Sequence, residues 1–110
     1  MLTESPYVII HTAVPVAQAK AVRLAMGQAG AGHLGNYSHC SGSYRSIGRF
    51  TPMAGAHPAI GQVGESEEVA EEIIEMLCHK DKVAEVIAAL KRAHPYEEPP
   101  IDIIPRFELE

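Results

Sequence analysis

All nine glycines of the 110-residue chain lie between Gly27 and Gly64, and this clustering constrains the fold more than any other feature of the sequence. Glycine costs conformational entropy, but it permits tight turns and close approach of the backbone to other groups. The same segment holds three of the six histidines and one of the two cysteines, and it contains no Asp or Glu. We therefore expect a tightly turned segment here and interpret it as the working surface of the protein.

The residues before this segment predict a strand followed by a helix. The run Tyr7–Ala13 is short, rich in β-branched residues and bounded by prolines, as is typical of a strand. From Pro15 to Gln28, apolar residues recur on one helical face, and proline suits the first position of a helix. Gly30 and Gly32 are placed to end this helix.

Within the glycine-rich segment, the polar residues Tyr37–Tyr44 can form a strand, with a partner that begins near Ile47 and returns through Gly48–Pro52. These two arms would make a hairpin. In an extended chain, His39 and Cys40 would point to opposite faces.

The residues after it predict a strand, a helix and a last strand. Glu71–Cys78 fits either period, and we favour a strand because the next segment, Lys82–His94, is a clear amphipathic helix. Asp81 is placed to cap that helix, and Pro95 prevents its continuation. Pro100–Phe107 alternates as a strand does, and Pro105 within it favours a position at a sheet edge.

This order of elements is the βαββαβ plan of a ferredoxin-like α+β sandwich, in which two helices cover one face of an antiparallel sheet. At 11.9 kDa, the chain has room for one domain, residues 1–110. The second face of the sheet would remain uncovered. Since such faces usually pack on another subunit, we expect a homo-oligomer.

Charge and composition exclude several classes of protein. The net charge is −5, with four bases and one acid in residues 1–64, and five bases and thirteen acids in residues 65–110. Neither half has the dense Lys/Arg patch that nucleic acids or anionic membranes require. No apolar run approaches the roughly 20 residues needed to span a bilayer, and the N-terminus does not resemble a signal peptide. Cys40 and Cys78 lack CxxC spacing, so we expect reduced thiols in a cytoplasmic protein.

Histidine and cysteine suggest a metal site, with His33, His39, Cys40 and His94 as candidate ligands for a divalent ion. Their spacing matches no tight CxxC or HxxxH pattern, and the alternative is that the histidines are structural or lie at an interface. Gly30–Gly35 formally matches GxGxxG, but it follows a helix instead of preceding one, which argues against a dinucleotide site.

Two further groups suggest ligand binding. Arg45 and Arg49 flank the predicted hairpin turn and, with nearby glycine amides, could hold a phosphate or carboxylate; alternatively, they could reach the acidic half of another subunit. Glu97 and Glu98 follow His94 in a proline-stiffened stretch that could serve acid/base chemistry or a metal, or form a solvated turn. The candidate ligand-binding residues are therefore Gly32, Asn36, Arg45, Arg49, Glu97 and Glu98.

Two stretches, GAGHLGNYSHCSGSYRSIGRFTPMAGAHPAIGQVG and AHPYEEPPIDI, resemble the inserted middle domain of the Nif-three-like proteins. The resemblance covers roughly residues 5–105 and implies a PII/CutA-like domain, a type that commonly assembles as trimers through its sheets. Members of that family carry a dinuclear metal centre, and some are described as GTP cyclohydrolase-like. Because those metal ligands lie in flanking halves outside the matching region, the resemblance assigns neither ligands nor hydrolase activity to residues of this chain.

Together these observations predict a non-enzymatic, PII/CutA-like oligomeric module with a regulatory role. The resemblance implies that the oligomer is a trimer. It would bind a metal ion or small anion in a cleft between the Gly27–Gly64 segment and the His94–Glu98 stretch. The alternatives are a small enzyme that uses His94 with Glu97 or Glu98 as acid and base, and a purely structural, partner-binding module.

Overall fold

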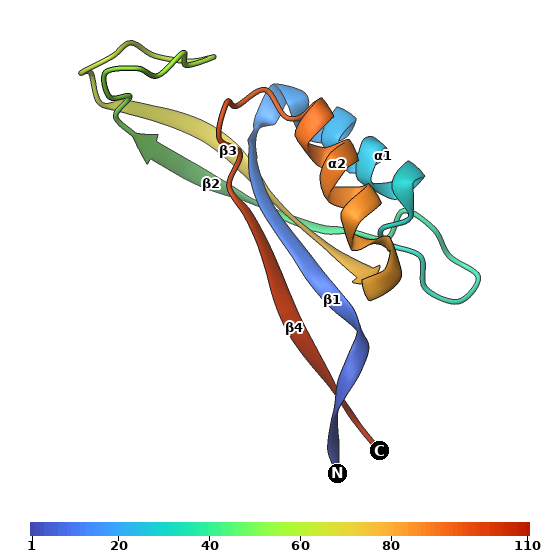
Figure 1. The fold of residues 1–110 in the computed structure, drawn as a ribbon. Coiled ribbons are helices and arrows are strands. Elements are labelled where there is room, and N and C mark those ends of the chain that lie inside the picture. Colours follow the sequence, from blue (N-terminus) through green and yellow to red (C-terminus); the bar gives the residue numbers. More distant parts are fainter.

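The computed structural model describes residues 1–110, which form a four-stranded antiparallel sheet and two helices (Figure 1). The ferredoxin-like α+β fold is confirmed, with strand order β2-β3-β1-β4. In chain order the elements are β1 (Leu2–Pro15), η1 (Val16–Gln18), α1 (Ala19–Ala29), β2 (Gly42–Phe50), β3 (Glu67–His79), η2 (Lys80–Lys82), α2 (Val83–Ala93) and β4 (Ile101–Leu109). Neither helix has the length and apolar character needed to cross a bilayer.

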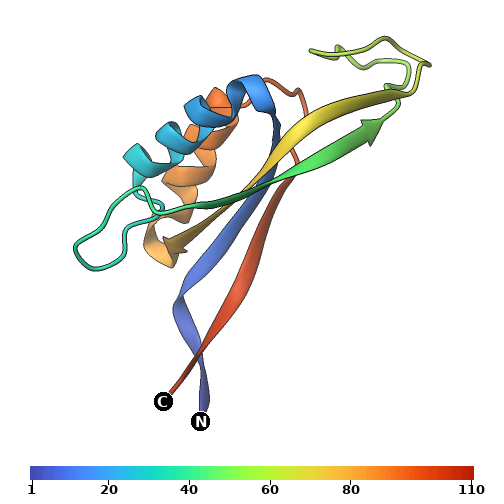
Figure 2. The same cartoon turned by 180° about the vertical axis from the view of Figure 1, so that it is seen from behind.

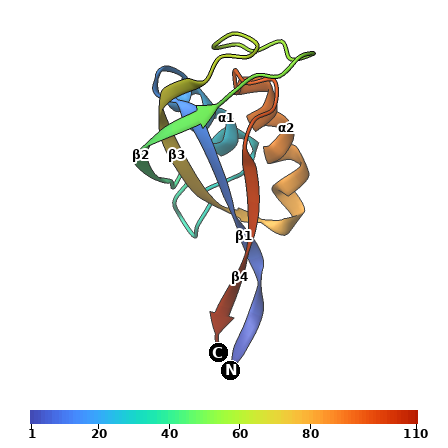
Figure 3. The ribbon, with the colours of Figure 1, turned by 90° about the vertical axis from the view of Figure 1, so that its left-hand side faces the viewer.

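Both helices pack side by side on one face of the sheet, and the opposite face carries no element (Figures 1 and 3). Alternate residues of the two central strands turn toward the helices because side chains of a strand alternate between faces. Their buried side chains form one core with those of α1 and α2, including Ile10, Val14, Val22, Met26, Ile74, Met76, Val86 and Leu90.

The uncovered face bears two apolar rows, each crossing three strands, with the polar row of Glu75, His11 and Asp102 between them. The strand register places Ile73 between Ala13 and Tyr44, and it places Ile9 between Leu77 and Ile104. Tyr44 is 54% exposed and Ile104 is 40% exposed. Exposed apolar side chains on an open sheet face are the kind of surface that another molecule covers.

The strand predictions at 7–13, 71–78 and 100–107 are confirmed within β1, β3 and β4. β4 is an edge strand, and Pro105 lies in it opposite Val8, next to a register shift in β1. Gly30 ends α1 with φ of 120°, as its position predicted.

The predicted hairpin is wrong. β2 is one uninterrupted strand that pairs along its whole length with β3. Gly48 does not turn the chain, because its φ is not in the positive region that other glycines here adopt. Arg45 and Arg49 therefore lie within a strand and flank no turn.

The strand predicted to begin at Tyr37 is also wrong in its first half. Residues 30–41 form a loop that contains an isolated bridge between Leu34 and Tyr37. His39 has a φ of 58°, which a continuous strand does not allow. The prediction that His39 and Cys40 point to opposite faces of a strand therefore does not apply.

Asp81 does not cap the second helix. A 3-10 turn, η2, precedes α2, and Asp81 lies inside that turn. Its backbone N–H donates to His79 Nδ1 at 3.1 Å, while the N-terminus of α2 has no side-chain cap.

The molecule is elongated, with extents of 50 × 27 × 24 Å. At one end β1 and β4 project as a two-stranded ribbon that brings the termini together (Figure 2). The Met1 amino group donates to Glu110 O at 2.8 Å, and the Glu110 amide donates to Met1 O at 2.9 Å. At the other end, the loop of residues 51–66 extends beyond β2 and β3 (Figure 1).

Candidate ligand-binding site

A pocket of about 520 Å³ lies where the 51–66 loop meets residues 94–100, the loop between α2 and β4. We call it the Glu71 pocket. Its wall is mainly apolar and carries three carboxylates and a tyrosine; its lining includes Ala13, Gly48, Arg49, Phe50, Pro52, Pro58, Ile60, Glu71, Tyr96, Glu97, Glu98 and Pro100. The predicted association of the glycine-rich segment with the His94–Glu98 stretch therefore forms within one chain.

His94 fixes the 94–100 loop onto β1. The side chain is buried at the end of α2, where its Nε2 lies 2.7 Å from Ala13 O and its Nδ1 accepts from the Tyr96 N–H at 3.1 Å. Since Nδ1 accepts, Nε2 must donate to the carbonyl, and the ring is the neutral Nε2–H tautomer. Burial lowers the pKa of His94, with smaller opposing effects from the Ala13 hydrogen bond and the charge of Glu71.

Tyr96 connects this histidine to a buried carboxylate. Its hydroxyl donates to Glu71 Oε2 at 2.5 Å, a length typical of a hydrogen bond to a charged acceptor. Burial and the Glu71 carboxylate both raise the pKa of Tyr96, so the phenol stays protonated and remains a donor. Glu71 is only 5% exposed, although it lies on the open face of β3.

Gly48 explains how a carboxylate fits beneath β2. A Cβ atom at this position would lie 2.1 Å from Glu71 Oε1, closer than any real contact. A glycine inside a strand often marks such a close approach. Gly48 is therefore required by its neighbour, and it keeps an ordinary strand conformation.

The two loops that line the pocket are joined directly. The His57 N–H donates to Glu97 Oε1 at 3.0 Å, which ties the 51–66 loop to the 94–100 loop. The Phe50 and Tyr96 rings meet edge to face with centroids 5.9 Å apart. Glu97 and Glu98 are otherwise exposed to solvent.

Three of the six predicted ligand-binding residues line this pocket: Arg49, Glu97 and Glu98. Arg49 Nε also donates to Glu68 Oε2 at 2.6 Å, so its charge is already paired. Arg45 is exposed on β2 and does not line the pocket.

Gly32 and Asn36 lie elsewhere, in the 30–41 loop. Gly32 is buried and structural: its N–H donates to Leu77 O at 2.6 Å, its carbonyl accepts from the Cys40 N–H at 3.0 Å, and a Cβ would lie 2.4 Å from Cys40 O. Asn36 is exposed to solvent.

The four candidate metal ligands do not meet within one chain. His33 and His39 are exposed in the 30–41 loop, with Cys40 half-buried beside them. His94 uses both ring nitrogens in the 94–100 loop. No group of three His, Cys, Asp or Glu side chains is arranged to hold a metal ion.

Sequence reasoning missed Glu71 and the roles of Gly48 and Tyr96. Glu71 carried no local signal, because five other glutamates lie within residues 65–75. Gly48 did carry a local signal, since an isolated glycine in a strand pattern indicates the close approach of another group as well as a turn.

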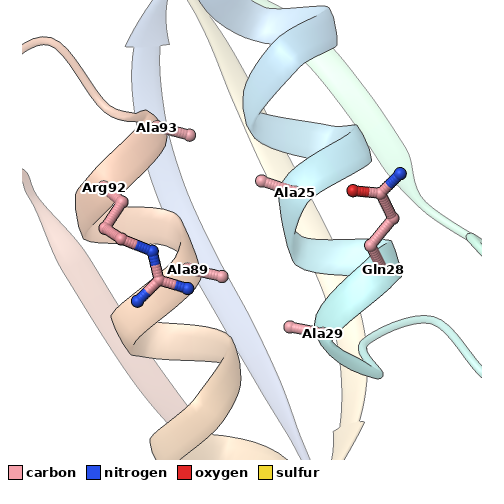
Figure 4. A pocket seen from close by; sticks show the side chains of 6 residues that line it. All are labelled: Ala25, Gln28, Ala29, Ala89, Arg92 and Ala93. Carbon is pink, nitrogen blue, oxygen red and sulfur yellow. The ribbon is translucent and has the colours of Figure 1, made fainter.

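A second hollow of about 400 Å³ lies between the two helices (Figure 4). Ala25 and Ala29 of α1 point toward α2, and Ala89 and Ala93 of α2 point toward α1. The hollow results from small side chains at a helix contact and gathers no set of polar groups. The Glu71 pocket is the better candidate site.

The chain has relatives of known sequence and structure, although no family model matches it. It is 52% identical over 90 residues to the GTP cyclohydrolase 1 type 2 homolog of Mycobacterium tuberculosis, a match that covers 82% of this chain and 24% of the relative. The crystal structure of a Bacillus cereus protein related to NIF3 matches with a TM-score of 0.79 and 40% identity, over 96% of this chain and 26% of that one. The chain thus spans about a quarter of the length of these relatives.

A likeness in fold alone connects the chain to smaller proteins. The periplasmic divalent cation tolerance protein CutA of Archaeoglobus fulgidus matches with a TM-score of 0.62 and 21% identity, over 91% of this chain and 83% of that one. The sequence matches and the similarity in fold agree on one relationship. The chain is a PII/CutA-like domain homologous to one segment of the Nif-three-like, or NIF3-related, proteins.

Proposed function

We propose that this chain is a non-enzymatic, self-associating module with a regulatory role, and that it binds a small ligand in the Glu71 pocket. The observation that carries this proposal is the hydrogen-bonded series from Ala13 through His94 and Tyr96 to Glu71. This series holds a buried carboxylate in the pocket wall before any ligand arrives. Small-molecule sites typically combine such placed polar groups with a mainly apolar wall.

Binding is favoured over catalysis by what the candidate acid and base already do. A general base needs a nitrogen or oxygen free to accept the substrate's proton. His94 has none free, since both ring nitrogens are engaged with the backbone. Glu97 holds the His57 amide and thereby joins two loops. The enzyme alternative would therefore depend on a carboxylate oxygen of Glu97 or Glu98, without His94.

Both ligand classes expected from the sequence require testing. The name of the CutA relative motivates a divalent metal, but the chain gathers no set of three metal ligands, so a metal would need donors from a second copy. An anion would meet three carboxylates and one arginine that is already paired with Glu68. The whole-protein activity of the longer relatives is not part of this proposal.

Isothermal titration with zinc chloride, inorganic phosphate, butyrate and n-butylammonium tests the ligand-binding proposal. We expect a saturable heat and a rise in Tm with one of these probes, because a ligand that binds only the folded state stabilises it. No heat and no Tm change with any probe would contradict the proposal.

Self-association through the uncovered sheet face is the second part of the proposal, and we propose a homotrimer. It is supported by two apolar rows on that face, one with Tyr44 and Ile73 and the other with Ile9 and Ile104. Light scattering after size-exclusion chromatography should give three times the chain mass. Tyr44→Lys should dissociate the assembly, whereas Leu24→Lys, at a 49% exposed position on α1, should leave it intact. A wild-type monomer would overturn this part.

The two cysteines support a reducing location. Cys40 and Cys78 are both free thiols, and free thiols persist in the reducing cytoplasm. We propose a cytoplasmic protein on that basis.

A further inference from the structure

Glu71 is a buried carboxylate without a cationic partner. The side chain is 5% exposed, and none of the seven ion pairs of the chain includes it. Its Oε2 accepts the Tyr96 hydroxyl, while Oε1 takes part in no hydrogen bond. Because Oε1 is also not sealed from solvent, it is reachable through the pocket that Glu71 lines. Burial of a charged carboxylate without a cationic partner costs free energy, unless a ligand or another group pairs with it.

The histidine nearest in the network does not supply that partner. His94 Nδ1 accepts from the Tyr96 N–H and so carries no proton. Its Nε2–H is directed to Ala13 O and not to Glu71. Burial, which lowers the pKa of His94, opposes a positive charge on this ring. The carboxylate therefore stays uncompensated within the chain.

The other acidic residues of the pocket add negative charge to that of Glu71. Glu97 and Glu98 line its outer part. The single basic residue there, Arg49, is held by Glu68 at 2.6 Å. Clefts lined by one sign of charge concentrate ligands of the opposite sign.

The remainder of the wall suits an apolar body. Phe50, Pro52, Pro58 and Ile60 line the side formed by β2 and the 51–66 loop. The Phe50 and Tyr96 rings contact each other edge to face and offer aromatic surface to a cation. A volume of about 520 Å³ is that of a small-molecule site.

We propose that the Glu71 pocket binds a small organic cation, a primary ammonium group on an apolar body, with Glu71 Oε1 as the acceptor for its N–H groups. This inference rests on the proposed ligand-binding function and specifies its ligand class. A primary ammonium fits better than a bare metal ion, since the chain gathers no three metal ligands, and better than a quaternary ammonium, which has no N–H for Oε1. The same chemistry is available from a free amine and from a lysine side chain of a second copy.

Calorimetric titration with n-butylammonium chloride tests the proposal on the full chain. The matched probes are n-butanol, butyrate and tetramethylammonium, which remove the charge, reverse it or remove the N–H donors. We expect saturable binding of n-butylammonium, with at least about tenfold weaker binding of the other three, because a hydrogen bond to a charged group is worth that factor or more. Equal or tighter binding of any of the other three probes would overturn the inference.

Two variants localise the site. Glu71→Gln keeps the shape and still accepts the Tyr96 hydroxyl, and we expect it to weaken n-butylammonium binding at least about tenfold. Glu85→Gln removes one carboxylate from α2 in the other layer and should leave the affinity unchanged. Retained affinity in folded Glu71→Gln, verified by circular dichroism, would overturn the assignment to Glu71.

The outcomes separate this inference from the proposed function. Binding of phosphate, butyrate or zinc without n-butylammonium would leave a ligand-binding module and overturn the ligand class. A lysine side chain of a second copy that occupied the pocket would compete with n-butylammonium. The affinity for n-butylammonium would then rise as the protein is diluted. That result would overturn the assignment to a free amine, whereas an affinity independent of protein concentration supports it.

Discussion

The regions at the two ends of β3 both contain histidine and other potential ligand-binding residues, but these side chains are arranged differently. The 30–41 loop contains His33, His39 and Cys40, and it presents them to solvent or half-buried without a shared target. The other end contains His94, Tyr96 and Glu71, which are linked by hydrogen bonds into the wall of a pocket. Metal-binding residue types alone therefore do not make a site.

Glycine shows the same difference. In the 30–41 loop, Gly32 makes room for the backbone of Cys40, so its role is to close the loop. In β2, Gly48 makes room for the carboxylate of Glu71. At both ends a side chain in place of the glycine would clash with a neighbouring group. Only at Gly48 is that neighbour a group that a ligand can reach.

Gly32→Ala should give the largest loss of stability. Its φ of 73° and a Cβ position 2.4 Å from Cys40 O combine backbone strain with a clash against a backbone atom. We expect a loss of about 3 kcal/mol in the free energy of unfolding, measured by urea denaturation. Gly35→Ala is the control, because it has φ of 56° with open space around the Cβ and should lose only about 1 kcal/mol. Equal losses in both variants would contradict the close-approach argument.

Gly48→Ala should cost less stability and more binding. The new methyl group must displace Glu71 Oε1, which would break the Tyr96 hydrogen bond or distort β2. We expect a loss of about 1 to 3 kcal/mol together with loss of n-butylammonium binding. Gly42→Ala lies in the same strand with nothing within 4 Å, and it should change the free energy of unfolding by less than about 0.5 kcal/mol. Normal binding by folded Gly48→Ala would argue against the pocket geometry.

His94 should link the stability of the protein to pH. Burial lowers the pKa of His94 below its ordinary value of 6.5, so below that pH the unfolded chain binds a proton that the folded chain does not. The free energy of unfolding should therefore fall as the pH drops from about 6.5 toward the folded-state pKa, and this component should then level off. Urea denaturation across this range should show the component in the wild type and not in His94→Gln. Its persistence in His94→Gln would assign it to another group.

The two cysteines should differ in reactivity, the smallest effect. Cys78 is 1% exposed, and burial raises its pKa, which lowers its thiolate fraction. Cys40 is half-buried in the 30–41 loop. Mass spectrometry after brief iodoacetamide treatment should find Cys40 modified and Cys78 intact, and urea should expose both. Rapid modification of Cys78 in the folded protein would contradict its placement in the core.

The sequence predicted the fold better than the site. Apolar periodicity identified the helices, because it records which face is buried. The strand at Tyr7–Ala13 was identified from its β-branched residues and bounding prolines, and the strand at Glu71–Cys78 from the helix that follows it. Arg45 and Arg49 were misplaced because the sequence was interpreted as a hairpin with a second strand beginning near Ile47, whereas β2 continues through these residues. The partnership of Glu71 with Tyr96 spans 25 residues and depends on strand register, so no local pattern could reveal it.

The pocket was predicted in outline and not in chemistry. The sequence suggested a cleft between the glycine-rich segment and the stretch from His94 to Glu98, and Tyr96, Glu97 and Glu98 of that stretch line the pocket with the segment that follows β2. The charge of the pocket depends on the burial of Glu71 and on the pairing of Arg49 with Glu68, both of which are tertiary features.

The most direct test of the contrast between the two ends is the affinity for n-butylammonium of two variants compared with the wild type. One variant is Glu71→Gln, and the other replaces the 30–41 loop candidates together as His33→Gln, His39→Gln and Cys40→Ser. Our account predicts that Glu71→Gln loses at least about tenfold in affinity and that the loop variant binds as the wild type does. Loss of binding in the loop variant, with Glu71→Gln unaffected, would contradict it.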